Sequence, residues 1–122
     1  MKPSKAKLYD ALGELIYAVA KADGAVQDAE RTQLEALLKD QTWGADVQWS
    51  FDYENRKALS VEDAYARALD TCKAYGPTEE YAFLMEALQR IAAAHEGVDE
   101  QEAGIIQRFT TALRTHFMEL DL

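Results

Sequence analysis

The sequence predicts an all-α fold, a bundle of helices in a single domain over residues 1–122. Apolar residues recur at three- and four-residue steps along most of the chain, and turn residues interrupt this period. In addition, two segments resemble each other after a shift of 72 residues. Length and composition agree with this prediction, because 48% hydrophobic residues with only six Gly and two Pro can build one core.

The first part of the chain predicts two helices joined by a tight turn. Residues 8–20 place apolar side chains on one helical face, and Ser4 is the expected N-cap residue. An Asp-Gly pair interrupts the pattern, and residues 27–39 resume it. Together these elements form a helix-turn-helix unit over about residues 4–40.

The middle of the chain, about residues 43–76, predicts additional short helices. Apolar and polar residues alternate over residues 47–54, which is typical of a strand. The same residues also fit a helical stripe of every fourth position, and no other segment could pair with a strand, so we favour a short helix. Ser60 is the expected N-cap residue of the next helix, which a Gly-Pro pair ends.

The last part of the chain, about residues 77–118, predicts two more helices. The apolar stripe that begins near Thr78 is the most regular in the sequence, and Gly97 ends it. Residues 99–102 have the form of a capping box at the start of the final helix.

The first and last units are related by an internal repeat. A shift of 72 residues gives six identities over the nineteen positions 12–30, and it places Glu30 on Glu102. Residues 20–30 read Ala-Lys-Ala-Asp-Gly-Ala-Val-Gln-Asp-Ala-Glu, and residues 94–102 repeat this segment in a degenerate form. The predicted architecture is therefore two related helix-turn-helix repeats with extra short helices between them.

This turn segment resembles the Ala-Asp-Gly, apolar, then Glu signature of the TerB-like tellurite-resistance family, whose fold also forms the N-terminal domain of the DjlA co-chaperones. The resemblance covers roughly residues 8–118. It implies a bundle of two helical repeats, a bacterial stress-response setting and an acidic site associated with cation binding. The second repeat departs from the pattern, because His95 stands where a second Asp is expected and Gly97 is displaced by one residue.

Composition and charge exclude several classes of function and suggest a compartment. Thirteen Lys and Arg against 22 Asp and Glu give a formal charge of -9, which opposes nucleic-acid binding. A single cysteine, Cys72, cannot form an intramolecular disulfide or supply a structural zinc site, so we expect a reducing compartment. No transmembrane segment or signal peptide is recognised, and the predicted location is cytoplasmic.

Acidic and imidazole side chains in the two turn segments are candidate ligands of a divalent cation. Carboxylates suit Ca²⁺, Mg²⁺ or Mn²⁺, and a histidine favours a transition metal such as Zn²⁺. The candidates are Asp23, Glu30, His95, Glu96, Asp99 and Glu102. A structural role for these residues stays open as the alternative. Glu30 and Glu102 lie three residues past a predicted cap, where a carboxylate can cap the helix, and the pair Asp23-Gly24 is typical of a turn. No other cofactor is expected.

No catalytic arrangement is recognised, so the protein is not predicted to be an enzyme. Cys72 lies on an apolar helical stripe, where a buried thiol is expected rather than a nucleophile. His116 lies in the last helical turn, where an imidazolium is favourable against the helix dipole, and it is assigned no chemistry.

Four aromatic residues cluster in the least regular part of the chain. They either cover the core or form a patch for a protein partner, since Trp and Tyr concentrate binding energy at interfaces. These residues are Trp43, Trp49, Phe51 and Tyr53. The leading hypothesis is a non-enzymatic stress-response module that binds a protein partner, with a membrane-associated complex as one setting. The alternative is a divalent-metal-binding protein, and the sequence does not define the oligomeric state.

Overall fold

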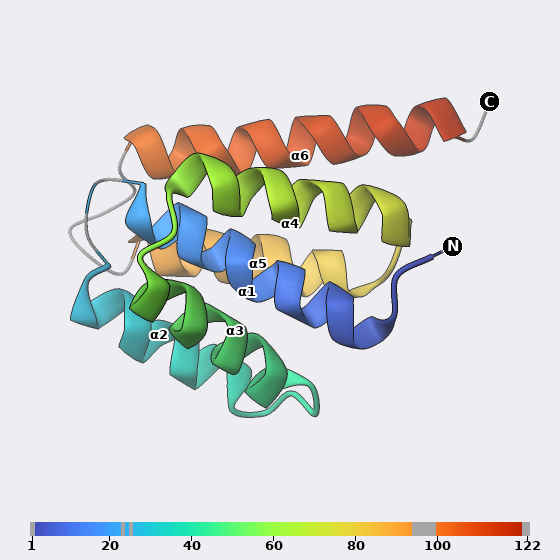
Figure 1. Cartoon of the computed structure of the whole chain (residues 1–122). Coiled ribbons are helices and arrows are strands. Elements are labelled where there is room, and N and C mark those ends of the chain that lie inside the picture. Colours follow the sequence, from blue (N-terminus) through green and yellow to red (C-terminus); the bar gives the residue numbers. More distant parts are fainter. Residues whose placement is uncertain (1, 23, 25, 94–99, 121–122) are drawn as a thin grey trace.

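The protein is a bundle of six helices in a computed structural model that describes residues 2–22, 24, 26–93 and 100–120, with side chains as far as Met118 (Figure 1). The helices are α1 (Lys5–Lys21), α2 (Asp28–Leu38), α3 (Gly44–Lys57), α4 (Val61–Tyr75), α5 (Glu80–Ala93) and α6 (Glu100–Leu120). No strand occurs among the described residues. The all-α prediction is confirmed, and residues 47–54 belong to a helix, α3.

Helix α1 lies at the centre of the bundle. Every residue from Ala11 to Ala20 except Glu14 is buried. Most contacts of α1 are with α3 and α4, and it also contacts α5 and α6. A helix that is covered on all sides must be apolar nearly all round, which explains the dense run of Ala, Leu, Ile and Val in this segment.

Helix α3 crosses α1 at very close range because residue 13 is a glycine. A Cβ atom at Gly13 would lie 2.6 Å from the Cβ of Ser50 and 2.6 Å from the carbonyl oxygen of Val47. The hydroxyl of Ser50 also donates a hydrogen bond of 2.7 Å to the carbonyl of Asp10. The backbone of α3 therefore rests directly on α1, which fixes the face that α3 turns outward.

Two serines cap the helices where the sequence predicts caps. The hydroxyl of Ser4 accepts from the backbone N–H of Lys7 at 3.2 Å, at the start of α1. The hydroxyl of Ser60 accepts from the backbone N–H of Asp63 at 3.1 Å, at the start of α4. Each hydroxyl satisfies an amide that would otherwise lack an intrahelical partner.

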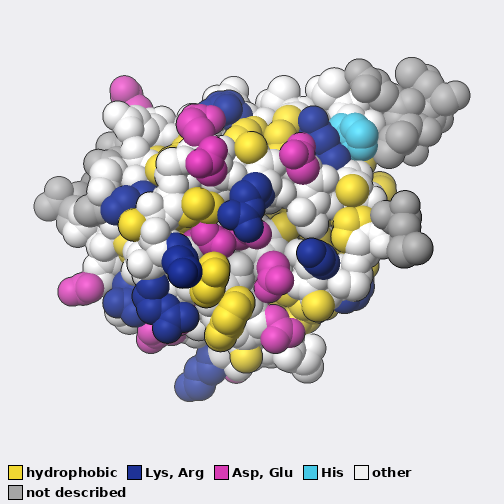
Figure 2. All heavy atoms as spheres, in the orientation of Figure 1, with side chains coloured by type: hydrophobic (Ala, Val, Ile, Leu, Met, Phe, Trp, Pro, Cys, Tyr) yellow, Lys and Arg dark blue, Asp and Glu magenta, His cyan; other side chains and the backbone are white. Residues whose placement is uncertain are grey.

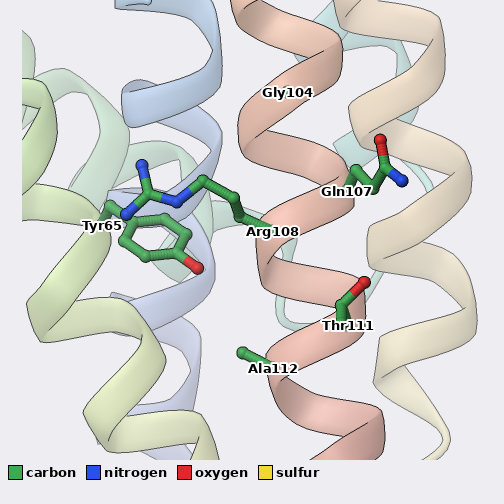
Figure 3. A pocket seen from close by; sticks show the side chains of 6 residues that line it. All are labelled: Tyr65, Gly104, Gln107, Arg108, Thr111 and Ala112. Carbon is green, nitrogen blue, oxygen red and sulfur yellow. The ribbon is translucent and has the colours of Figure 1, made fainter.

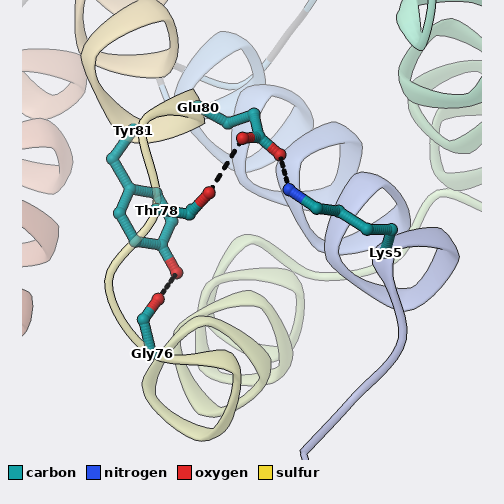
Figure 4. A network of polar contacts seen from close by, with 5 residues as sticks. All are labelled: Lys5, Gly76, Thr78, Glu80 and Tyr81. Atoms are coloured by element: carbon teal, nitrogen blue, oxygen red, sulfur yellow. Dashed lines mark hydrogen bonds and ion pairs between the residues drawn. The ribbon is translucent and has the colours of Figure 1, made fainter.

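The beginnings of α1 and α5 are joined by an ion pair between an exposed lysine, Lys5, and a buried glutamate, Glu80 (Figure 4). The carboxylate of Glu80 accepts from Nζ of Lys5 at 2.5 Å and from the hydroxyl of Thr78 at 2.8 Å. Burial by itself raises the pKa of Glu80, but these two hydrogen bonds and the charge of Lys5 outweigh it and lower the pKa below its usual value. Glu80 is therefore ionised in the fold.

A tyrosine closes the turn between α4 and α5. The hydroxyl of Tyr81 donates to the carbonyl of Gly76 at 2.9 Å (Figure 4). It also lies 3.1 Å from the carbonyl of Cys72. Carbonyls at the end of a helix lack intrahelical partners, so this hydroxyl serves as a side-chain cap for α4.

Candidate functional site

The outward face of α3 carries an exposed pair of stacked aromatic rings. Trp49 is 58% exposed and Tyr53 is 37% exposed. Their ring centroids lie 5.2 Å apart at an interplanar angle of 17°. One turn further on, Nζ of Lys57 lies 5.7 Å from the centroid of the Tyr53 ring. We call Trp49, Tyr53 and Lys57 the aromatic ladder.

The ladder is exposed because of the way α3 packs. Val47 and Phe51 are buried on the inward face of α3, beside the close crossing at Gly13. Residues four apart lie on the same side of a helix, so 49, 53 and 57 form a separate outward line. Figure 2 shows hydrophobic side chains over α3, with basic side chains beside them.

A groove adjoins the ladder between α2 and α3. Its volume is about 650 Å³, and its lining includes Glu35 from α2, Lys39 just after the end of α2, and Ala45 and Gln48 from α3. Ala45 in the lining lies one helical turn before Trp49, so the groove and the ladder are one turn apart along α3. The ladder and the groove together form a surface that could take an extended or helical segment of another chain.

The other two predicted partner-binding aromatics lie elsewhere. Phe51 is buried and meets Tyr17 edge-on, with ring centroids 6.4 Å apart. Trp43 is partly buried, stacked on Tyr9 at 5.4 Å and edge-on to Phe83 at 5.1 Å. The prediction of one four-residue patch is therefore corrected: Phe51 lies in the core, Trp43 is partly buried against it, and Trp49 and Tyr53 are exposed.

Two of the predicted metal ligands, Glu30 and Glu102, lie in equivalent places on their helices. Each is the third residue of its helix and each is buried. The carboxylate of Glu30 accepts from the backbone N–H of Gln27 at 2.9 Å, which is the capping arrangement that the sequence also allowed. Capping accounts for the position of Glu30 at the start of α2.

The remaining metal candidates cannot be placed. Asp23, His95, Glu96 and Asp99 lie outside the residues that the structure describes. Within residues 2–22, 24, 26–93 and 100–118, no group of three or more His, Cys, Asp or Glu side chains is arranged to hold a metal ion.

A polar cleft of about 370 Å³ between α1 and α4 was not anticipated from the sequence. Its lining includes Asp10, Glu14, Arg67 and Asp70, and Arg67 lies 3.5 Å from the Glu14 carboxylate. Burial raises the pKa values of Glu14 and Asp10. The sequence does contain a signal for this cleft. Asp10 and Glu14 lie four residues apart, on one side of a largely apolar helix, where an apolar stripe alone would not place two acids.

A second shallow pocket lies between α4 and α6 (Figure 3). The guanidinium of Arg108 lies 4.4 Å from the centroid of the Tyr65 ring and donates to both carboxylate oxygens of Glu62, at 3.1 and 3.4 Å. Because Arg108 already contacts both Tyr65 and Glu62, these three side chains link α4 to α6, and the guanidinium is not free to bind a ligand.

The one cysteine has the properties expected of a buried structural residue. Cys72 lies in the core on α4. Burial raises the pKa of its thiol to about 12, so the reactive thiolate is scarce at neutral pH.

These features define the class of protein as a six-helix bundle with an exposed aromatic face. The family model described as tellurite resistance protein TerB matches residues 10–120, nearly the whole chain. The chain therefore belongs to the TerB family and is a helical domain associated with tellurite resistance. Comparison with curated proteins and comparison with solved structures each found no match. In the described part of the chain, no helix has the length and hydrophobicity needed to cross a membrane.

Proposed function

We propose that this protein is a non-enzymatic, cytoplasmic module of a tellurite-resistance stress response that acts by binding a protein partner through Trp49 and Tyr53. The exposed, stacked pair on α3 is the observation that carries the proposal. Membership of the tellurite-resistance family supports the proposed stress-response setting. The alternative stays a divalent-metal-binding protein, and four of its six candidate ligands lie outside the described residues.

Three features favour a binding role for the pair. Contiguous exposed apolar surface often marks an interaction site, and these two exposed rings stack on each other. Stacking restricts both rings before a partner arrives, which lowers the entropic cost of association. The groove beside them provides a concave surface against which the same partner could pack.

Binding should depend strongly on these two rings. Aromatic residues at the centre of an interface typically lose about 2 kcal/mol or more on truncation to alanine, roughly a thirtyfold loss of affinity. Because both side chains are substantially exposed and point away from α1, the same substitutions should change the free energy of unfolding by only about 0.5 kcal/mol.

Affinity capture from a lysate of the native host tests this proposal. The bait is the whole chain, compared with a Trp49→Ala/Tyr53→Ala double variant. Arg90→Ala is the control, since Arg90 is an exposed side chain on a different helix, α5. We expect the parent and the control to capture the same protein and the double variant to lose it with an unchanged circular dichroism spectrum. Equal capture by all three proteins would refute the proposal.

A further inference from the structure

A separate apolar pocket lies between α5 and α6, away from the aromatic ladder. Its volume is about 350 Å³. The apolar part of its lining is formed by Tyr81, Met85, Leu113, Phe117 and Met118. The rings of Tyr81 and Phe117 are stacked with centroids 6.0 Å apart, so they form one continuous wall.

The hydroxyl groups in this lining are already engaged within the protein. The Tyr81 hydroxyl donates to the carbonyl of Gly76. The hydroxyl of Thr110 donates to the carbonyl of Ile106 at 2.8 Å and lies 3.2 Å from the sulfur of Met85. The interior therefore presents hydrocarbon, aromatic and thioether surface, which suits a ligand group that needs no hydrogen bonds.

The remaining polar group in the lining is a cation, Arg114. Among the described side chains, no carboxylate lies within 4 Å of its guanidinium. Residues 103–118 contain no Asp or Glu, although the whole chain has a formal charge of -9. In this described stretch Arg108 is already paired with Glu62, so Arg114 is the guanidinium that the pocket offers to an anion.

We propose that this pocket binds a single-chain anionic amphiphile of the fatty-acid class. The hydrocarbon chain lies against the apolar lining and the carboxylate meets Arg114. The volume is at the lower end of the range of about 300–1,000 Å³ found for ligand pockets, which limits the pocket to a small ligand such as one hydrocarbon chain. Met85 and Met118 are unbranched and flexible, so they can adapt to such a chain.

The test uses dodecanoate, below its micelle-forming concentration, as the probe. Nuclear magnetic resonance of isotope-labelled methionine methyl groups should show saturable shifts of Met85 and Met118. Fluorescence from Trp43 and Trp49, which lie outside the lining, should stay unchanged and so exclude general adsorption. Each methylene that becomes buried strengthens binding by up to about fourfold, so octanoate should bind about tenfold or more weakly than dodecanoate.

Charge and position are tested with matched variants. Arg114→Gln should weaken dodecanoate binding about threefold to fivefold, within the range of an exposed ion pair. Arg90→Gln makes the same charge change at an exposed site on α5 and should have no effect. Met118→Glu places a carboxylate beside the pocket and should abolish binding, while the exposure of Met118 leaves the fold intact.

Three results would overturn the proposal. The first is the absence of saturable shifts at Met85 and Met118. The second is equally tight binding of dodecyltrimethylammonium, which has the same chain and the opposite charge. The third is binding to phosphatidylglycerol vesicles without binding to dissolved dodecanoate, which would indicate a membrane surface instead of a free amphiphile.

Discussion

Two glycines inside helices show how the packing around a residue determines the effect of a substitution. Gly13 and Gly104 both lie inside helices, where glycine is intrinsically unfavourable by about 0.5–1 kcal/mol relative to alanine. At Gly13 an added Cβ would collide with α3, whereas at Gly104 it would meet no heavy atom within 4 Å. The same substitution at these two sites should therefore have opposite effects.

We predict that Gly13→Ala destabilises the protein by about 1–3 kcal/mol, because the backbone of α3 must move away from α1. Gly104→Ala should stabilise it by about 0.5–1 kcal/mol. Alanine reduces the conformational entropy of the unfolded chain and makes no clash in the folded protein. Urea unfolding monitored by circular dichroism measures both values. Destabilisation by Gly104→Ala would show that the α4–α6 pocket needs a residue without a side chain.

The buried glutamates illustrate what a sequence pattern can and cannot define. The positions of Glu30 and Glu102 at the third residue of their helices follow from capping signals, and both were predicted. Their burial was not predictable, because it depends on which helices cover the ends of α2 and α6 in three dimensions.

At the scale of helices, α3 shows why the alternating pattern of residues 47–54 was ambiguous. In a strand, the apolar residues 47, 49, 51 and 53 would share one face. In the helix they separate into an inward pair, Val47 and Phe51, and an outward pair, Trp49 and Tyr53. The inward face also includes the polar residues Ser50 and Glu54, which hides the helical period in the sequence.

The ion pair between α1 and α5 gives a prediction at the same scale. The pKa of Glu80 is lower in the fold than its usual value of 4.5, so ionisation of Glu80 stabilises the fold above that pH. This contribution is lost as the pH falls through the lowered pKa, when Glu80 becomes protonated. We predict that Glu80→Gln unfolds more readily at neutral pH and loses less stability below pH 4.5 than the parent does.

Glu14→Gln is the matched control for this titration. Burial raises the pKa of Glu14, so its contribution has the opposite sign: it is present at low pH and lost as the pH rises through the raised pKa. This variant should gain stability relative to the parent above pH 4.5. Thermal unfolding across an acidic pH series gives both profiles, and parallel profiles for Glu80→Gln and the parent would contradict the assigned role of the ion pair.

At the scale of the whole molecule, the helical periods and the turn segment were enough to predict the all-α fold and the family. The two surfaces of functional interest were harder to predict. The α5–α6 pocket combines Tyr81 and Met85 with residues about thirty positions later, so it exists only once the helices are packed. Exposure of Trp49 and Tyr53 likewise depends on which face of α3 meets α1.

The measurement that tests the central claim most directly is site-specific photo-crosslinking in the native host under tellurite stress. A photoreactive amino acid replaces Trp49 or Tyr53, with position 90 on α5 as an exposed control. The account predicts one protein adduct, identified by mass spectrometry, from positions 49 and 53 and its absence from position 90. Failure to form an adduct at 49 and 53, or the same adduct from all three positions, would contradict partner binding through the aromatic ladder.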